Sequence, residues 1–398
     1  MKTLLLTLEY PSRASYYDDW RDAFIAAPQF DVTVRNIFER AARAEIERTI
    51  GDYELTVVLH ACTADSLLYA DPLVSALQNR KGRLVAFIGN ELNLPFAPLG
   101  AKIDWLKRVR PDIVATQLLE EAGAWLYADV GARVISLPHA LNPEAFHSRT
   151  PQRDRPIDIG ARSFRYLAYL GDDERNRIYD YFAANRFSPK LALDLSTEQR
   201  FDRAGWAAFL DRCKATIATE AGSWFLERDD ATVLAIRDHL ARSNGGGFVI
   251  RADSPLQGVA HRLPYRIKAL ARQLLRRGPI RHEALTAEQA DFAEIHARFF
   301  AGRPRSPVYA KCISSRHFDA IGTKTVQIMF PGRYNDILET DRHYLALQPD
   351  FANIDAVMAR FRDPADRSRI AEAAHAHVMA GHTYKHRMAQ LAEALNKI

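Results

Sequence analysis

The chain has little cysteine and no long apolar run. Its three cysteines, Cys62, Cys213 and Cys312, are odd in number and lack C-x-x-C spacing, so the sequence offers neither a disulfide framework nor a cysteine-based metal or redox site. No stretch approaches the roughly 18 apolar residues of a membrane span. The apolar run at the start is interrupted at Glu9, which makes it too short for a signal peptide. We therefore expect a cytoplasmic protein whose contact with a membrane, where it occurs, is peripheral.

A large excess of charge of one sign is also absent. Lys and Arg number 54 and Asp and Glu number 49, which gives a net charge of +5. This mild excess suits anionic partners such as nucleotide phosphates or acidic lipid surfaces, and it is too slight to indicate a nucleic-acid-binding protein. The apolar fraction of 47% and the charged fraction of 26% are those of an ordinary globular protein with a large core.

Several catalytic motifs are missing too. The sequence contains no P-loop, no G-x-G-x-x-G after a strand, no H-E-x-x-H and no G-x-S-x-G. Their absence argues against P-loop nucleotide hydrolysis, a dinucleotide fingerprint, a zinc protease site and a serine nucleophile elbow. Function must therefore be sought in less common patterns.

What the chain does have is a repeated alternation of strands and helices. At 398 residues it is long enough for two domains. In residues 1–150, strand-like runs apolar on both faces alternate with helical patterns such as 66–79 and 118–128, which predicts an α/β domain with a parallel sheet. We predict that residues 1–150 are a Rossmann-like domain. Its expected strands are 3–8, 31–36, 54–60, 83–89, 112–116 and 133–137.

The alternation restarts after a polar stretch at 147–156 that contains Pro151 and Pro156 and is typical of a linker. We predict a second Rossmann-like domain over 151–380 and a terminal helix at 381–398 that packs back near the first domain. Two such domains leave a cleft between the carboxyl ends of their strands. The expected strands are 157–161, 191–195, 216–219, 247–250 and 325–330, and the expected helices are 174–182, 231–242, 287–300, 354–361, 366–379 and 383–396.

One segment of the second half has the features of an anion site. A helix that begins near Arg316 presents free N–H groups and a positive dipole end, and Lys311, Ser314 and Ser315 lie just before it. Together they suit a diphosphate. Asp319, which we expect in the first turn, can accept two hydrogen bonds from a ribose diol. A structural ion pair between Arg316 and Asp319 is the alternative.

The same segment resembles a known family. Residues 311–328, KCISSRHFDAIGTKTVQI, are similar to the donor-binding loop, helix and strand of group 1 glycosyltransferases, whose pattern is S-x-R-x-F-E-A-x-x-x-G followed by a strand. The run from Pro138 to Phe146, PHALNPEAF, resembles the end of the first domain in glycosyltransferases of the GT-B fold. Residues 363–367 and 382–387 resemble the spore-maturation-protein (CgeB-like) branch.

This resemblance implies the GT-B fold and transfer of a hexose or related sugar from a nucleotide-diphosphate sugar to an acceptor. The acceptor is left open as a glycan, a lipid-linked glycan or a small molecule, and retention of configuration is implied over inversion. The D-x-D metal motif of the other glycosyltransferase fold is absent, so no cofactor or metal is required. The family has two glutamates eight positions apart, where this chain has Lys311 and Asp319, which leaves the sugar open.

The resemblance also suggests further donor contacts. Arg162 follows a predicted strand at its carboxyl end and corresponds to an arginine that reaches the donor phosphates in the resembled branch. Glu220, Gly222 and Ser223 follow another strand and could approach the base or sugar, although a plain strand-to-helix turn is the alternative. Catalysis would then be electrostatic, with Arg162, Lys311, Arg316 and the helix N-terminus opposing the charge that grows on the departing phosphate.

The first domain is expected to hold the acceptor at its strand ends. Candidates are His60 and Glu91 as catalytic residues and Tyr10, Arg13, Asn90 and His139 as acceptor contacts, although a lone histidine at a strand end is often structural. A basic helix at 261–277 and, more weakly, 102–110 with Trp105 could lie on anionic lipid. Two other functions stay open: another nucleotide-sugar enzyme such as an epimerase or hydrolase, and an inactive coat or assembly protein of the same fold.

Overall fold

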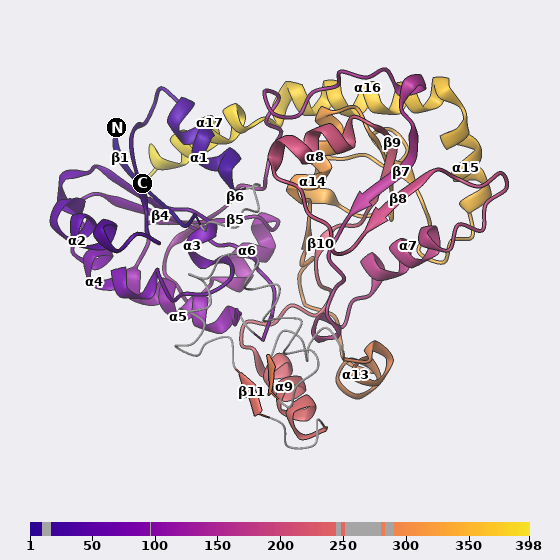
Figure 1. The fold of residues 1–398 in the computed structure, drawn as a ribbon. Helices are drawn as coiled ribbons and strands as arrows, with labels where there is room; N and C mark the ends of the chain where they lie inside the picture. The colour runs from indigo at the N-terminus through magenta and orange to yellow at the C-terminus, as the bar shows by residue number, and fades with distance from the viewer. Residues whose placement is uncertain (10–16, 96, 244–247, 251–279, 283–289) are drawn as a thin grey trace.

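A computed structural model spans residues 1–398 and describes all of them except 10–16, 96, 244–247, 251–279 and 283–289. The described chain folds around two parallel sheets, each covered by helices on both faces, that stand side by side (Figure 1). The α/β class and the two parallel sheets predicted from the sequence are confirmed.

The first sheet has six parallel strands, in the order β2-β1-β3-β4-β5-β6. β3 and β5 are buried along their whole length, as expected for parallel strands covered on both faces. The strands are β1 (Lys2–Thr7), β2 (Asp31–Asn36), β3 (Leu55–Val58), β4 (Arg83–Phe87), β5 (Ile113–Thr116) and β6 (Arg133–Ser136), and the helices are α1 (Asp18–Ala26), α2 (Arg40–Thr49), α3 (Ala61–Ala64), α4 (Val74–Gln78), α5 (Leu99–Val109) and α6 (Glu120–Leu126).

The helix predicted over 66–79 is much shorter than expected. A 3₁₀ turn over Asp71–Leu73 carries Pro72, and α4 begins only at Val74. Proline has no N–H and clashes with the preceding turn, so it is accepted only at the start of a helix. The apolar pattern predicted a helix that begins before Pro72, whereas a proline is compatible only with the start of a helix.

The second sheet has five parallel strands, in the order β15-β14-β9-β7-β8. When its strands are numbered along the chain from β7 and read from β8 to β15, the order is 2-1-3-4-5, which is the order of the first five strands of the first sheet. The strands are β7 (Ile157–Arg162), β8 (Leu193–Ser196), β9 (Cys213–Ala218), β14 (Val326–Met329) and β15 (Leu345–Ala346), and the helices are α7 (Glu174–Ala183), α8 (Arg203–Leu210), α14 (Ser315–Gly322), α15 (Ile354–Arg362) and α16 (Pro364–Gly381).

A small additional unit lies below the two sheets in Figure 1. Here β11 (Phe248–Ile250) pairs in parallel with β12 (Ile280–His282) in a separate two-stranded sheet, so the prediction that 247–250 joins the second sheet is wrong. α9 (Ala231–Ser243) and α13 (Phe292–Phe299) share a core with Ala168 and Tyr169 of the second half, which also includes Ile236, Ile295 and Phe300. A further antiparallel pair joins β10 (Ala221–Gly222) to β13 (Lys311–Cys312).

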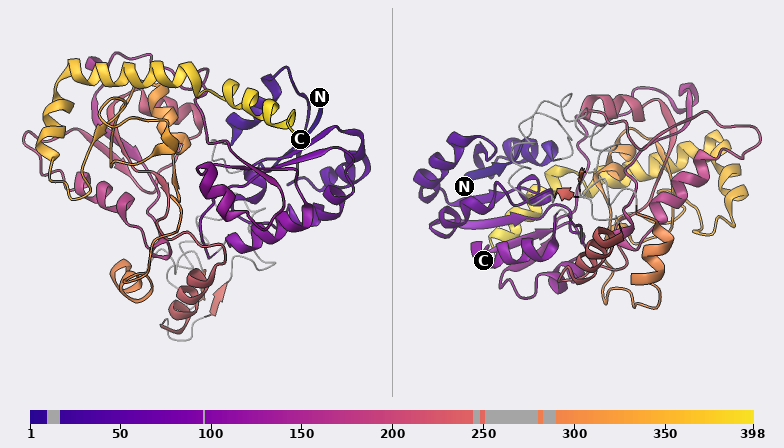
Figure 2. Two further views of the ribbon diagram at one scale, coloured as in Figure 1. Left: turned by 180° about the vertical axis from the view of Figure 1, so that it is seen from behind. Right: turned by 60° about the horizontal axis from the view of Figure 1, so that its bottom comes forward.

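The end of the chain returns to the first sheet. α16 runs along the second half, and α17 (Tyr384–Leu395) then packs beside α1 (Figure 2). Tyr384, Leu391 and Leu395 are buried in the same core as Leu5 and Trp20. The crossing is pinned by two backbone hydrogen bonds, from Leu141 to His382 and from Tyr384 to Leu141.

The strand order of each sheet marks one position on its edge. In the first sheet the connections that leave the adjacent strands β1 and β3 run toward opposite edges of the sheet. In the second sheet the same holds for β7 and β9. Open α/β sheets bind ligands in the crevice outside the carboxyl ends of two such strands. The fold therefore offers one such crevice in each half.

Candidate active site

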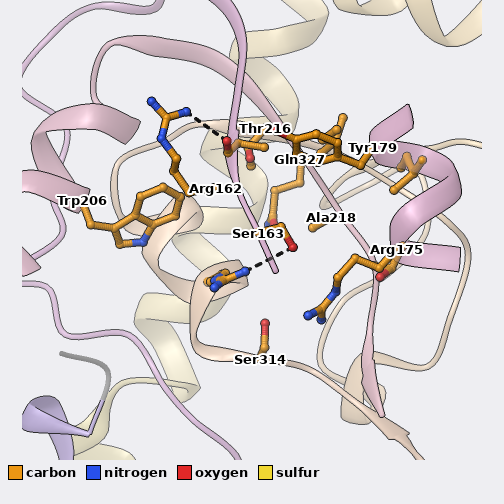
Figure 3. A pocket seen from close by; sticks show the side chains of 14 residues that line it. Arg162, Ser163, Arg175, Tyr179, Trp206, Thr216, Ala218, Ser314 and Gln327 are labelled. Atoms are coloured by element: carbon orange, nitrogen blue, oxygen red, sulfur yellow. Dashed lines mark hydrogen bonds between the residues drawn. The ribbon is translucent and has the colours of Figure 1, made fainter. Parts of the chain in front are cut away.

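A pocket lies at the crevice of the second sheet (Figure 3). The ends of β7 and β9 form its floor, the first turns of α7 and α14 form its walls, and α8 contributes an indole. The lining residues are Ala161, Arg162, Ser163, Arg175, Ile178, Tyr179, Trp206, Thr216, Ile217, Ala218, Thr219, Ser314, Arg316 and Gln327.

The N-terminus of α14 lies at this pocket and is held in a fixed position. The backbone N–H of Ser314 donates to Nδ1 of His317 at 3.0 Å, which fixes the first turn as in a capping box. Burial lowers the pKa of His317 to about 3, so the ring is neutral and can accept this bond. On the far side, Gly322 packs so tightly against the carbonyl of Phe146 that a Cβ would lie 2.5 Å from it. The helix therefore holds its N-terminal N–H groups in place.

Two arginines bring positive charge into the pocket. Arg316, in the first turn of α14, donates from Nη1 to Oγ of Ser163 at 3.4 Å. Arg175, in the first turn of α7, stands over the ring of Tyr166 at 4.0 Å, and it forms no ion pair with any carboxylate of the described residues. Figure 3 shows Arg175, Ser163 and Ser314 directed toward a common space. Two cations, hydroxyls and a helix N-terminus at one crevice are a site for a polyanion such as a diphosphate.

Arg162 does not take the position expected from the sequence. Its guanidinium donates to the Asp194 carboxylate at 2.8 Å and to the Asp194 carbonyl at 2.8 Å, and it lies over the Phe209 ring at 4.1 Å. In Figure 3 its charged end points away from Arg175 and Ser314. Arg175 is the residue that sequence reasoning missed, and its position in the first turn after Asp172-Asp173 was the available signal.

Asp319 is also placed differently from the prediction. It is the fifth residue of α14 and so belongs to the second turn, and its carboxylate accepts a hydrogen bond from Nε1 of Trp206 at 3.0 Å. Burial, reinforced by the nearby Asp19, raises the pKa of Asp319 well above its ordinary value. Trp206 lines the pocket and Asp319 does not.

Lys311 serves the framework of the site. Its ammonium lies 2.6 Å from a carboxylate oxygen of Asp172 and 2.6 Å from one of Glu174, and it sits 4.5 Å from the centre of the Trp224 ring. A lysine so buried and so paired is not available to a departing phosphate. This placement corrects its assignment as a catalytic cation.

The turn at Glu220, Gly222 and Ser223 is structural as well. Glu220 accepts the backbone N–H of Tyr334 at 2.6 Å and the hydroxyl of Tyr309. Ser223 donates to the carbonyl of Leu170 at 2.6 Å. Gly222 has φ of +112°, and a Cβ there would lie 2.4 Å from a backbone oxygen. None of these three lines the pocket. Gly222 belongs to β10, which pairs with β13, so the segment is not a plain strand-to-helix turn either. Ser315, buried at the start of α14, does not line the pocket.

A cluster of stacked rings lies in the first half, where His60 and His139 follow β3 and β6 and are almost completely buried. The His60 and His139 rings lie 5.6 Å apart and 21° from parallel, and Tyr17 stacks on His60 at 5.4 Å. Trp20 donates from Nε1 to Nδ1 of His139 at 3.2 Å. Within the described part of the chain, neither ring nitrogen of His60 has a hydrogen-bond partner. Burial lowers the pKa of His60 well below its ordinary value and that of His139 to about 3.

Two of the remaining candidates of the first half, Glu91 and Asn90, form hydrogen bonds within the protein. Glu91 is buried and accepts from the hydroxyls of Thr116 and Tyr127, at 2.6 Å each, and from a backbone N–H, so its assignment as a catalytic residue does not fit its environment. Asn90 donates to the carbonyl of Ala64 at 3.2 Å. Tyr10 and Arg13 lie outside the described residues.

Two segments, 261–277 and 102–110, were predicted to contact anionic lipid. The basic segment 261–277 lies outside the described residues. In α5, Lys102 and Trp105 are almost completely buried, and Lys102 donates to the carbonyls of Gly89 and Asn90 at 2.8 and 3.0 Å, so these two side chains cannot contact lipid. Within the described ranges, no helix is both long and apolar enough to cross a membrane, and no group of three or more potential ligands could hold a metal ion.

Comparison with known proteins identifies the architecture. Residues 285–393, which carry α14 and the strands and helices after it, match the family described as "Glycosyl transferase-like". The structure of Anabaena Alr3699/HepE in complex with UDP and glucose superposes with a TM-score of 0.50 at 10% identity, over 100% of both chains. An alpha-glucosyltransferase in complex with UDP-glucose and abasic DNA superposes with a TM-score of 0.51 at 10% identity, over 100% of this chain and 99% of that one.

The chain has the GT-B fold. At this identity the two structures establish the arrangement of a GT-B protein and nothing further. By sequence, no curated protein matches the chain. The family match covers the C-terminal part of the GT-B second half, and α14 with its arginine lies within it.

Proposed function

We propose that the protein is a glycosyltransferase that moves a hexose or related sugar from a nucleotide-diphosphate sugar to an acceptor. The observation that carries this proposal is the pocket at the β7/β9 crevice, where Arg175, Arg316 and the N-terminus of α14 converge. The family match over 285–393 supports it, and so do the GT-B structures whose titles name UDP and UDP-glucose as ligands.

In this proposal the diphosphate lies between the two arginines. Charge grows on the departing phosphate as the bond to the sugar breaks, and preorganised cations in a partly dry pocket stabilise it more strongly than water does. Arg175, Arg316 and the helix dipole would supply this stabilisation without a metal. In a retaining reaction on one face of the sugar, the departing phosphate itself takes the proton of the acceptor hydroxyl. Positioning then provides most of the remaining rate enhancement.

The acceptor would bind at the crevice of the first sheet. The His60, His139 and Trp20 rings lie beneath that edge of the sheet and are almost completely buried, so they would support the acceptor site rather than contact the sugar. A glycan, a lipid-linked glycan and a small molecule are the acceptor classes in the proposal. A lipid-linked acceptor would place this cytoplasmic protein at the surface of an anionic membrane, and the spore-maturation branch is the proposed lineage within GT-B.

Nucleotide binding measured by calorimetry tests the donor site. We expect UDP to bind the wild-type protein, and Arg175→Ala to weaken binding by roughly 10- to 100-fold, since a charge-assisted hydrogen bond contributes about 1.5–3 kcal/mol. Arg177→Ala is the matched control, because Arg177 lies on the same helix but bonds to the carbonyl of Pro349. Equal affinity in wild type and Arg175→Ala would sink the site assignment, and failure of UDP, ADP and GDP all to bind would sink the function.

One observation favours a second candidate, a GT-B protein that binds nucleotides without transferring sugar. The chain has Lys311 where the resembled family has a glutamate, and this lysine is locked between Asp172 and Glu174. Product analysis separates the candidates. Transfer that requires an acceptor supports the transferase, turnover of the donor alone indicates an epimerase or hydrolase, and tight nucleotide binding with no turnover indicates the inactive protein.

A further inference from the structure

The pocket is chemically different at its two ends. Figure 3 places Trp206 at one end and Arg175 at the other, with Ser163 and Ser314 between them. The arginine end is suited to phosphates. The indole end offers a broad apolar ring, half-buried, that the diphosphate does not need.

The orientation of this indole is fixed from two directions. One neighbour is Phe209, whose ring is stacked with the indole at 5.6 Å and 19°. The other is Asp319, which accepts the indole N–H at 3.0 Å. α8 itself begins at a standard cap, where the Asp202 side chain accepts the N–H of Gly205 at 2.8 Å. Trp206 is therefore preorganised before any ligand arrives.

The Asp319 side chain is not exposed to a ligand in this pocket. It is almost completely buried, and it is absent from the pocket lining while Trp206 is part of it. A carboxylate buried in this way is stable only with a donor, and Trp206 from α8 supplies that donor. The contact joins two helices that are more than 100 residues apart, so the indole and the carboxylate depend on one another.

We propose that Trp206 contacts the nucleoside of the donor, and that Asp319 is a positioning residue that orients this indole rather than a direct ribose ligand. The inference rests on the proposed function, because it assumes that the diphosphate lies at Arg175 and Arg316. From there a nucleoside would extend toward Trp206. Stacking on an aromatic ring suits every base because each has a π face.

Calorimetry with two ligands tests the first part. UDP carries a nucleoside and inorganic pyrophosphate does not. We expect Trp206→Leu to weaken UDP binding about 10-fold or more and to leave pyrophosphate binding within twofold of wild type, whereas Arg175→Ala weakens both. Trp125→Leu is the control, since Trp125 is a partly buried tryptophan on α6 of the first half. Unchanged UDP affinity in Trp206→Leu would overturn the inference and leave the proposed function intact.

Substitutions at Asp319 test the second part. Asp319→Asn keeps an oxygen that accepts the indole N–H, so UDP affinity should stay within about threefold of wild type. Asp319→Leu removes the acceptor and should weaken UDP binding as much as Trp206→Leu does. The double variant should then lose no more than either single variant, as expected when one residue acts through the other.

A deoxynucleotide comparison decides the matter even if Asp319→Leu does not fold. We expect wild type and Asp319→Asn to discriminate equally between UDP and 2′-deoxy-UDP. A direct ribose contact predicts instead that wild type prefers UDP and that Asp319→Asn loses this preference, which would overturn the positioning role. If wild type binds neither UDP nor pyrophosphate, the proposed function fails first and this inference fails with it.

Discussion

Nζ of Lys311 lies 2.6 Å from Oδ2 of Asp172, and only 2% and 1% of the two side chains are exposed. Burial alone would lower the pKa of Lys311, but the carboxylates of Asp172 and Glu174 outweigh it and raise that pKa. The lysine that departs from the family pattern is thus the centre of a buried ionic cluster. Because Glu174 is the first residue of α7 and precedes Arg175, the cluster also supports the first turn of that helix.

Lys311→Met should destabilise the protein severely. Removing one partner of a buried ion pair leaves uncompensated charge and typically costs 3–5 kcal/mol. We expect a loss of about this size in the free energy of unfolding, measured by denaturant titration. Lys324→Met is the control, because the pair with Glu372 is largely exposed and should contribute at most about 1 kcal/mol. Equal effects of the two substitutions would contradict a structural role for Lys311.

Acid should destabilise the protein through its buried histidines. Burial lowers the pKa of His139 and of His317 to about 3 in the folded state, whereas an unfolded histidine titrates near 6.5. Between these values the unfolded chain binds protons that the folded chain does not, so stability falls as the pH falls.

Each such histidine contributes up to about 1.4 kcal/mol per pH unit below pH 6.5. We expect the free energy of unfolding to drop steadily from pH 6.5 to pH 4.5, and His139→Gln to make that slope shallower. His147→Gln, at an exposed position, should not alter the slope. A stability profile that is flat over this range would contradict the neutral, buried assignment.

Asp230 should connect the additional unit to the first half. Its carboxylate accepts the backbone N–H of Leu99 at 3.0 Å and that of Gly100 at 2.7 Å, at the start of α5. The side-chain amide of Asn93 donates a third bond to the same carboxylate at 3.0 Å. This is a helix cap supplied from 130 residues away.

We expect Asp230→Ala to cost about 1–2 kcal/mol, as the loss of a helix cap does, with proteolysis near α9 becoming faster. Denaturant titration and limited proteolysis measure the two effects. Asp238→Ala, at an exposed position of α9, should change neither. Wild-type proteolysis in Asp230→Ala would show that other contacts hold the unit.

Arg203 should hold the two halves in register. Its Nη1 lies 2.8 Å from the Asp19 carboxylate and 2.7 Å from that of Asp22, so α8 of the second half is tied to α1 of the first. Asp19 is buried, and Arg203→Ala would leave it with Asn142 as its remaining neutral donor.

We expect Arg203→Ala to lower the free energy of unfolding by about 1–3 kcal/mol, the cost of leaving a buried polar group short of a partner. The rate of transfer should fall while the UDP dissociation constant stays within about threefold. Arg203→Lys should restore part of both losses. A large change in UDP affinity would place Arg203 in the donor site instead.

The sequence predicted the sheets well because their signal is local. Runs such as Leu55–Val58 and Ile113–Thr116 are buried on both faces, a pattern typical of parallel strands covered by helices. The three apolar residues Phe248–Ile250 read the same way but pair elsewhere, because a run so short does not specify its partner.

The sequence predicted the elements around the candidate site but not the directions of their side chains. The helix after Ser314 and the strand that ends at Arg162 are both present. Arg162, however, turns to Asp194, and Lys311 pairs with Asp172 across more than 100 residues. Such pairings depend on which strands become neighbours, so the position of Trp206 in the pocket could be recognised only once the fold was known.

The return of α17 also sets an order of assembly. Tyr384, Leu391 and Leu395 complete the core that contains Leu5 and Trp20, and Arg83 reaches the carbonyl of Leu395 across 312 residues. During synthesis this face of the first sheet, which Trp20 and Phe24 of α1 cover in part, therefore stays incomplete until α17 has left the ribosome. The core of the second sheet, which contains no residue of α17, is free to form before that moment, although it is made later than the first sheet.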